Sequence, residues 1–498
     1  MFYQRNKYDH SSPRIKTLTN ANADIIARTK RINNRDIAYR TATAFVGILG
    51  GLAIAYYPPF GGLSIAGMQA LGTIFFMVIF LAFRPIPMAA TALLTLWIFW
   101  ALLNIPVVVV FTGYTNPVFW FIFSALTLSV AAEKSGLAKR IAYAIVSRVG
   151  FSSNRLLAGF VGASLVSIIF IPDGNARTAV LMTIVIGFLT LMKVSKDSPL
   201  AKRLGVTVGY LNVAAASTAV FTANAIQIAA VGVLNSTEHL TISYVQWSLY
   251  AAVPALLAPL LAVFFLVPRI FKVKQQISES EARETVTSEA RSMGKISTRE
   301  VAILVLIVAA IVLWATGSLT SISVDVVGLI VAILLFTPLG GVKISDIPNS
   351  YWAVIFFNGT LFALPGILGK EGVSAFIAKN LTTLVNSHNP AIFSLSIGLV
   401  ALLANATLSN LAAIGIILPS LFKIGTSLGF SPIFVTVLFS YATSMELFYY
   451  MNGPSITALG FGLYSVKDWM KLVSVLALIQ LILIPVYALT YWHIVGLV

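Results

Sequence analysis

The sequence predicts an all-α integral membrane protein with about 11 transmembrane helices and two re-entrant hairpins. Of its 498 residues, 58% are hydrophobic and only 10% are charged, whereas a soluble domain carries roughly 25% charged residues. The mean hydropathy is +0.90, and apolar runs recur at close to the ~20 residues that a helix needs to cross a bilayer. The runs are continuous rather than alternating, which favours helices over a transmembrane barrel.

The charged residues divide the chain into four segments. We expect a basic cytoplasmic tail (1–42), a first membrane repeat (43–271), a hydrophilic cytoplasmic linker (272–300) and a second membrane repeat (301–498). The tail and the linker are rich in Lys and Arg, which in multi-pass proteins of the plasma (inner) membrane mark the cytoplasmic side. This pattern predicts a cytoplasmic N-terminus and a C-terminus outside. The tail either lies on anionic lipid or is disordered.

The net charge of +16 follows from this loop bias, and nucleic-acid binding is not expected because no soluble domain presents a basic face. The chain has no cysteine, which excludes disulfides and thiolate metal sites. No phosphate loop, nucleophile or metal-ligand cluster is recognisable, so we expect neither an enzyme nor a bound cofactor.

The two membrane segments share a pattern. An aromatic-rich run before Lys134-Ser135-Gly136 is matched by one before Lys370-Glu371-Gly372, and each reads as a re-entrant hairpin or as two short spans. Asn175 follows Gly136 at nearly the same separation as Asn410 follows Gly372. Internal repeats, often inverted in the membrane, are typical of transporters. The alternative is chance similarity between two apolar sequences.

Polar residues interrupt an apolar run at matching places, Phe170–Thr178 and Asn405–Ala412. Pro and Gly end a helix, and Asn and Ser cap the next one. A helix that starts inside the membrane points free N–H groups and a partial positive charge into the interruption. Such an end suits a carboxylate, so two facing ends would suit a dianion. The alternative is a pair of ordinary polar kinks.

Two charged residues stand at membrane depth, where charge is costly and usually functional. Arg177 is interpreted as a ligand of a substrate carboxylate, as a fixed cation, or as the partner of Asp173 four residues earlier. Glu446 is the other buried-ion candidate. Polar stretches after each interruption, Ser217–Asn224 and Asn452–Ser455, would offer backbone carbonyls to a cation or close over substrate; ordinary interhelical hydrogen bonds are the alternative.

The triplets Gly174-Asn175-Ala176 and Ser409-Asn410-Leu411 resemble the paired Ser-Asn-Thr motifs of the divalent anion/sodium symporter family, which includes bacterial dicarboxylate and citrate carriers. Lys134–Leu137 and Gly359–Leu361 are also similar to the family's hairpin segments. The resemblance extends from about Thr43 to Val498. It implies a homodimer in the lipid bilayer, with inverted repeats, substrate held between two hairpin tips, and an elevator movement of the transport part.

The resemblance and the residue types together define the candidate sites. The predicted substrate-binding residues are Asn175, Ala176, Arg177, Thr178, Ser409, Asn410, Leu411, Pro454 and Ser455. The residues predicted to bind a cation or compensate charge are Gly174, Arg177, Ser217, Asn224, Asn405 and Glu446. Gly174, Ala176 and Leu411 occupy motif positions but keep only backbone groups there.

The departures from the family motif bear on sodium. Gly174 lacks the hydroxyl that helps to hold sodium in the family, and the Gly-Thr-Pro-Pro-Asn stretches are replaced by Val220–Asn224 and Met451–Ser455. A hard cation prefers several oxygen ligands, and Arg177 stands close to where sodium would be expected. The sequence therefore favours sodium-independent exchange of small di- or tricarboxylates, with succinate, malate, 2-oxoglutarate and citrate fitting equally.

Three alternatives stay open at this point. The first is a sodium-coupled dicarboxylate symporter, in which sodium ions are cotransported. The second is a sodium/proton antiporter, which would need acidic residues in both interruptions, although only Asp173 is present. The third is an anion channel. No metal ligand is assigned.

Overall fold

The computed structural model describes residues 37–149, 152–212, 218–273, 287–288, 291–320, 322–449 and 451–498. The described residues form helices and no strand. Nine of the described helices are long and apolar enough to cross a membrane, and five shorter apolar helices accompany them. The prediction of an all-α membrane protein is therefore confirmed.

In the first half, the helices follow one another with short connections. They are a first helix (Ile37–Ala55), α2 (Ile65–Phe83), α3 (Met88–Trp97) with η1 (Ile98–Leu102), α4 (Val107–Val110), α5 (Thr112–Thr115), α6 (Pro117–Lys134), α7 (Leu137–Val149), α8 (Ser153–Phe170), α9 (Gly174–Leu191), α10 (Pro199–Asn212), η2 (Phe221–Ala223), α12 (Ala225–Glu238), α13 (Tyr244–Leu261) with η3 (Ala262–Leu266), and α14 (Val267–Ile270).

The second half has a similar make-up. Its helices are α16 (Thr298–Ala315), α17 (Gly317–Thr320), α18 (Val324–Phe336), η4 (Ile344–Asp346), α19 (Asn349–Lys370), α20 (Val373–Thr382), α21 (Pro390–Thr407), α22 (Asn410–Ser427), α23 (Pro432–Thr443), α24 (Gly453–Gly460), α25 (Val466–Leu489) and α26 (Tyr491–Ile494).

The order of elements recurs between the halves. α6 and α7 correspond to α19 and α20, the α8–α9 pair to α21–α22, and the interrupted helix α10/α12 to α23/α24, after which α13 corresponds to α25. The turns after α6 and α19 each contain a glycine at positive φ, Gly136 and Gly372, which glycine adopts without steric cost. The inverted orientation of the repeats and their boundaries stay predictions.

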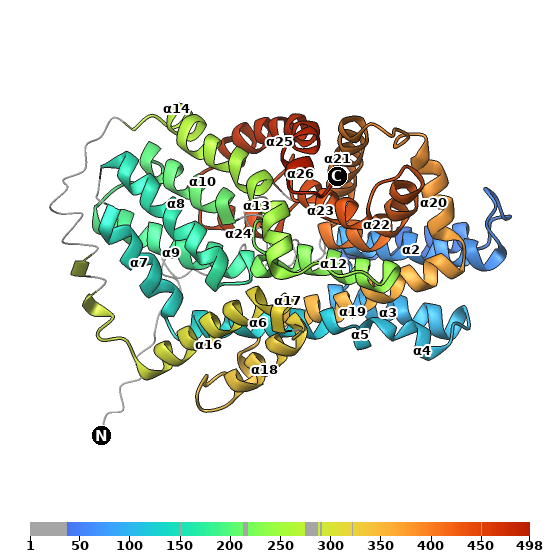
Figure 1. Cartoon of the computed structure of the whole chain (residues 1–498), viewed down its shortest axis with the longest axis horizontal. Coiled ribbons are helices and arrows are strands. Elements are labelled where there is room, and N and C mark those ends of the chain that lie inside the picture. Colours follow the sequence, from blue (N-terminus) through green and yellow to red (C-terminus); the bar gives the residue numbers. More distant parts are fainter. Residues whose placement is uncertain are drawn as a thin grey trace, which may run out of the picture.

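The two halves interlock. α9 of the first half packs against α24 of the second, and α22 of the second packs against α12 of the first. In Figure 1, α6, α16, α18 and α19 lie along the lower side, whereas α8–α10, α13 and α21–α25 occupy the upper side, with α12 between them. α12 contacts both α6 and α19. The polar interruptions are thus brought together in the middle of the molecule.

The structure locates the hairpins more narrowly than the sequence did. α6 is itself long enough to cross a membrane, and the returning α7 carries Lys139, Arg140 and Arg148. The Asn-containing triplets lie at the α8–α9 and α21–α22 turns, not at the Lys-x-Gly turns. These two turns are therefore the hairpin tips on which the site is built; their re-entrant character stays a prediction.

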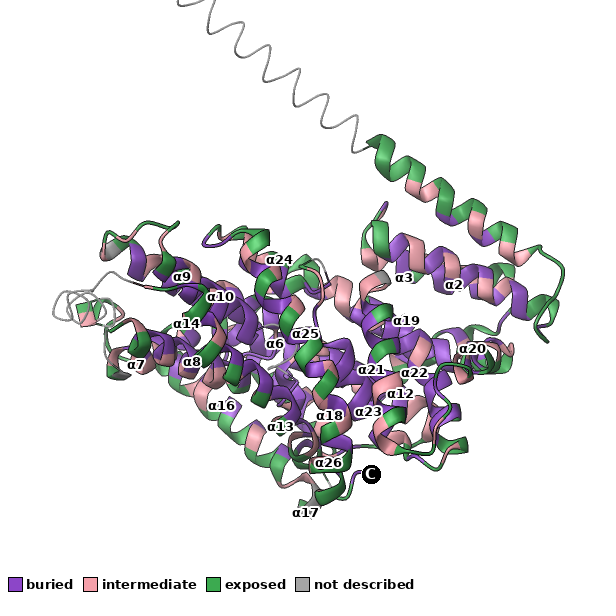
Figure 2. Ribbon diagram, turned by 90° about the horizontal axis from the view of Figure 1, so that it is seen from above, coloured by how far each residue is buried: buried purple, intermediate pink, exposed green. Residues whose placement is uncertain are grey.

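The periphery is apolar and exposed, as a lipid-facing surface requires. Figure 2 shows the helix that follows the grey N-terminal trace as almost entirely exposed, and only 11% of its apolar window is buried. A cavity of about 500 Å³ lies between this helix, α2 and α3–η1. Its lining is mainly aliphatic and aromatic, so we do not assign it to an anionic substrate.

Candidate functional site

The first hairpin tip (Ile171–Asp173) separates α8 from α9. Pro172 has no N–H to donate, so it cannot continue the hydrogen-bond ladder of α8. Asp173 then caps α9, because its Oδ1 accepts a hydrogen bond from Ala176 N at 2.7 Å. Ile171 and Pro172 are buried. α9 therefore begins inside the protein, with its N-terminal dipole directed into the tip.

Arg177 is fully buried, with 0% of its surface exposed. Its Nη1 donates to Ile171 O at 2.5 Å and to Ala223 O at 2.6 Å. Its Nε and Nη2 have no hydrogen-bond partner among the described residues. The guanidinium thus fastens the first tip to the residues before α12, and its Nε and Nη2 donors stay available. Asp173 serves as the cap of α9.

The second hairpin tip (Leu408–Ser409) separates α21 from α22, and Ser409 Oγ caps α22 by accepting from Ala412 N at 3.2 Å. Two asparagines fasten this tip to the end of α23. The Nδ2 atoms of Asn405 and Asn410 each donate to Thr443 O at 2.8 Å. Asn405 Nδ2 also donates to Met445 O at 3.0 Å. Neutral amides hold the second tip where a guanidinium holds the first.

The start of α24 joins the two tips. Asn410 Nδ2 donates to Asn452 Oδ1 at 3.1 Å, and Asn452 occupies the N-cap position of α24. From the other side, Thr457 Oγ1 donates to Asn175 Oδ1 at 3.0 Å. A Cβ added at Gly174 would lie 2.9 Å from Pro454 Cγ. The N-termini of α9, α22 and α24 therefore converge.

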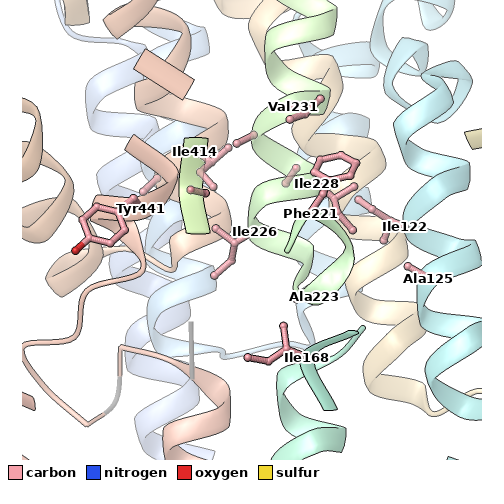
Figure 3. Close-up of a cluster of buried hydrophobic side chains, with 14 of the residues drawn as sticks. Ile122, Ala125, Ile168, Phe221, Ala223, Ile226, Ile228, Val231, Ile414 and Tyr441 are labelled. Atoms are coloured by element: carbon pink, nitrogen blue, oxygen red, sulfur yellow. The ribbon is translucent and has the colours of Figure 1, made fainter. Parts of the chain in front are cut away.

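The described residues between α10 and α12 (218–224), which we call the first break, contact those between α23 and α24 (444–449 and 451–452), which we call the second break. Thr218 Oγ1 donates to Ser444 Oγ at 3.0 Å. Asn224 caps α12 by accepting from Ile226 N at 3.4 Å. Figure 3 shows apolar side chains packed around this region, including Phe221 of η2, Ile226 of α12 and Ile414 of α22. Polar interruptions are thus enclosed by an apolar shell.

Glu446 lies in the second break and is buried, with 3% of its surface exposed. Ser455 Oγ lies 2.6 Å from its Oε1 and 2.7 Å from its Oε2. The Ser455 hydroxyl donates its hydrogen to Glu446, so it cannot donate that hydrogen to a substrate in this conformation.

The other predicted residues take distinct positions. Asn175 is exposed beside the equally exposed Gly453, while Ala176 and Thr178 are buried and Leu411 is half-buried. Thr178 Oγ1 has no partner among the described residues. Ser217 lies outside the described residues. No sequence pattern singles out Thr457, which becomes a site residue only because α9 and α24 meet.

Four carbonyl groups near the tips and breaks accept hydrogen bonds from Arg177 or from two asparagines. Arg177 occupies those of Ile171 and Ala223, and the two asparagines occupy those of Thr443 and Met445. Sodium, like other hard cations, needs several oxygen ligands. Among the described residues, no three acidic or histidine side chains gather as a metal site.

Comparison with known proteins identifies the family of this chain. The family model of the sodium:sulfate symporter transmembrane region matches residues 38–498. The chain belongs to this family. The L-tartrate/succinate antiporter of Shigella dysenteriae serotype 1 (strain Sd197) is 26% identical over 412 residues, which cover 77% of this chain and 80% of the relative. The L-tartrate/succinate antiporter of Escherichia coli (strain K12) shows the same identity and coverage.

Among solved structures, the YdaH transporter of Alcanivorax borkumensis is similar at 14% sequence identity and a TM-score of 0.48, over 76% of this chain and 86% of that one. This likeness is too weak to support an argument. The family match establishes a membrane-embedded transporter, in agreement with the family resemblance found in the sequence.

Proposed function

We propose that this transporter exchanges small dicarboxylates across the membrane without sodium. The observation that carries the proposal is the guanidinium of Arg177, which donates to Ile171 O and Ala223 O. A mobile cation would need such carbonyl oxygens, and here a fixed cation holds them. The names of the antiporter relatives support exchange of succinate-like substrates.

In this proposal, the substrate lies where the N-termini of α9, α22 and α24 converge, with α12 starting nearby. One carboxylate is received by α9 and by the free Nη2 of Arg177, since a guanidinium binds carboxylates in a planar fork. The other is received by α22 at Ser409 and Asn410. The distance between two carboxylates on a short carbon chain then selects a dianion over a monoanion.

The fixed charge accounts for obligatory exchange. An empty carrier would move an uncompensated guanidinium through the low-dielectric interior, which is costly. A loaded carrier moves a compensated site. The mobile part comprises α8–α10, α12, α13 and α21–α25, which lie on the upper side of Figure 1 except for α12 at its boundary. It moves as an elevator against α6, α16, α18 and α19, within a homodimer of the plasma membrane.

The test is uptake of labelled succinate by proteoliposomes that contain the full chain. Uptake is measured with and without sodium outside, and with and without unlabelled succinate inside. Uptake that requires internal succinate and ignores sodium is the expected result. Arg148→Ala, which alters an exposed arginine bonded to Ala144 O, serves as a matched control and should behave as wild type.

The family description favours a second candidate, a sodium-coupled dicarboxylate symporter. That candidate predicts sodium-dependent uptake into vesicles that contain no internal dicarboxylate. Such a result for the wild-type protein would overturn the exchange proposal, and backbone carbonyls would then have to exchange hydrogen bonds for sodium during transport.

A further inference from the structure

The buried carboxylate of Glu446 is not used by the proposed exchange. It contacts a single hydroxyl, that of Ser455, through both of its oxygens. Within the described part of the chain, no lysine or arginine pairs with it. An ionised carboxylate removed from water without a basic partner is strongly disfavoured, so some cation must offset its charge for part of the transport cycle.

The contact with Ser455 can accommodate a proton. The Ser455 hydroxyl has one hydrogen, which an ionised Glu446 accepts in a bifurcated bond to both oxygens, at 2.6 and 2.7 Å. When Glu446 is protonated, it can donate from one oxygen to Ser455 Oγ while the Ser455 hydroxyl donates to the other oxygen. Protonation thus turns one shared hydrogen into two separate hydrogen bonds.

The surroundings are unsuited to a metal cation. Asn452 Nδ2 and Trp469 Nε1 face the carboxylate without completing a hydrogen bond to it in this conformation, and such N–H groups favour its ionised form. N–H groups repel a cation. The other titratable groups that sense Glu446 are the phenols of Tyr210 on α10 and Tyr464 between α24 and α25. A proton needs no coordination shell of oxygens, unlike a metal ion.

The position of Ser455 connects this carboxyl to the substrate site. Ser455 is the third residue of α24, whose N-terminus contacts Gly174 and Asn175 of α9. An ionised Glu446 beside the first turn offsets the positive end of the helix dipole. Protonation removes that negative charge, so that the same helix end attracts an anion more strongly.

We propose that Glu446 binds one proton together with the substrate, so that dianion and proton bind cooperatively. The inference rests on the proposed dicarboxylate site. The proton is taken from water on the side where substrate enters and forms one O–H bond on Glu446. That bond breaks when substrate leaves, and the proton returns to water on the other side. By linkage, acid conditions strengthen substrate binding, and substrate promotes proton uptake to the same extent.

The direct test is proton uptake by the purified full chain when L-tartrate is added in weakly buffered solution. Wild type should take up protons near neutral pH, whereas Glu446→Gln should take up fewer. Glu371→Gln, at the end of α19 and away from the breaks, is the control and should match wild type. Glu446→Asp keeps an acid at this position and should restore proton uptake.

Affinity provides the second readout. The ratio of wild-type to Glu446→Gln dissociation constants for L-tartrate cancels the titration of the substrate itself. This ratio should be near one at acid pH and rise to about threefold to tenfold at alkaline pH, the range for a charge at a helix end. If Glu446→Gln does not fold, Ser455→Ala should shift the pH at which proton uptake occurs.

Equal proton uptake by wild type and Glu446→Gln, or a ratio that does not change with pH, overturns the inference and leaves dicarboxylate exchange standing. A wild-type protein that binds neither L-tartrate nor succinate at any pH overturns the proposed function, and the inference with it.

Discussion

Both hairpin tips are held by side-chain N–H groups that donate to backbone carbonyls, but the side chains differ. At the first tip, the guanidinium of Arg177 ties Ile171 O to Ala223 O. At the second, the amides of Asn405 and Asn410 reach Thr443 O. Each tip is thus fastened to the interrupted helix of its own half by N–H donors. The difference is charge, because the first fastening carries a permanent cation and the second is neutral.

The same comparison applies to the counter-charges. The first tip has Asp173, which is committed to capping α9, whereas the second break has Glu446, held by a hydroxyl. The two repeats therefore differ in charge. The cluster of Arg177 and Asp173 is permanently charged, whereas the cluster of Glu446 and Ser455 is the one proposed to respond to pH. Substitutions at Arg177 and at Asn410 change the fastening of the first and of the second tip separately.

The largest effect is expected when the charged fastening is removed. Arg177→Ala leaves two buried carbonyls unpaired and the substrate without its cation, so succinate exchange should fall about a hundredfold, equivalent to ~3 kcal/mol for hydrogen bonds to a charged group. Arg177→Lys keeps the charge but loses the planar fork of donors, so its rate of succinate exchange should fall about tenfold. Sodium-dependent uptake that appears in Arg177→Ala would confirm that the guanidinium replaces a cation; unchanged exchange would refute its role.

The neutral fastening should matter for stability as well as for the carboxylate that we propose α22 receives at Asn410. Asn410→Ala removes two buried hydrogen bonds, to Thr443 O and Asn452 Oδ1, and should destabilise the protein by about 1–3 kcal/mol. Asn380→Ala is the matched control, because Asn380 donates to Phe376 O at 2.8 Å from an exposed position. Thermal unfolding in detergent measures both variants. Equal melting temperatures would show that the second tip is not held by this amide.

The contact between the tips is tested at Gly174. A Cβ there would lie 2.9 Å from Pro454 Cγ and 3.1 Å from Asn212 O, so Gly174→Ala should separate α9 from α24 at a cost of about 1–2 kcal/mol. Gly366→Ala, where a Cβ meets nothing within 4 Å, should not destabilise. Substrate affinity should fall in the first variant only; a well-bound substrate in Gly174→Ala would place the anion elsewhere.

The smallest effect is expected for an ion pair outside both clusters. Lys134 Nζ lies 2.5 Å from Asp346 Oδ2, and hydrogen bonds from the Lys134 side chain and the Lys343 backbone lower the pKa of Asp346. A lowered pKa in the folded state means that this acid stabilises the protein at neutral pH, and that the contribution is lost as pH falls through that value. Asp346→Asn should lower the melting temperature slightly at neutral pH, and less in high salt.

If Asp346→Asn lowered the melting temperature as much as Asn410→Ala does, this ranking of exposed and buried contacts would be contradicted. The comparison is made at one protein concentration and in one detergent, so that only the side chain differs.

The sequence located the tips because the residues that end and cap helices act locally. Pro172, Asp173 and Ser409 stop one helix and cap the next through contacts within three residues. The partner of Arg177 was less predictable. Asp173 is four residues away, but its backbone is extended, so it does not share a helix face with Arg177. The guanidinium instead reaches Ala223 O, far along the chain.

The contacts that make one site from two halves were not predictable from the chain. Thr457 meets Asn175, and Thr218 meets Ser444, only because the helices cross in space. Thr457 has no local pattern that marks it, and Thr218 lies in the predicted polar stretch Ser217–Asn224, which does not identify its partner. The predicted roles of Asn175, Ser409 and Asn410 remain predictions, while their convergence with α24 is a property of the fold.

The exchange of partners between the halves has a consequence for synthesis at the ribosome. α9 packs against α24, and α12 packs against α22, so each polar element of the first half is covered by an element made later. Once translation has passed Glu238, Arg177 can already donate to Ile171 O and Ala223 O, which belong to the first half. Until Gly460 has been made, α24 is not yet present to pack beside Gly174. The first half therefore stays in the membrane with its first tip uncovered until the second half is made. Translocation machinery or chaperones that cover exposed polar groups have the largest such surface to cover at that stage.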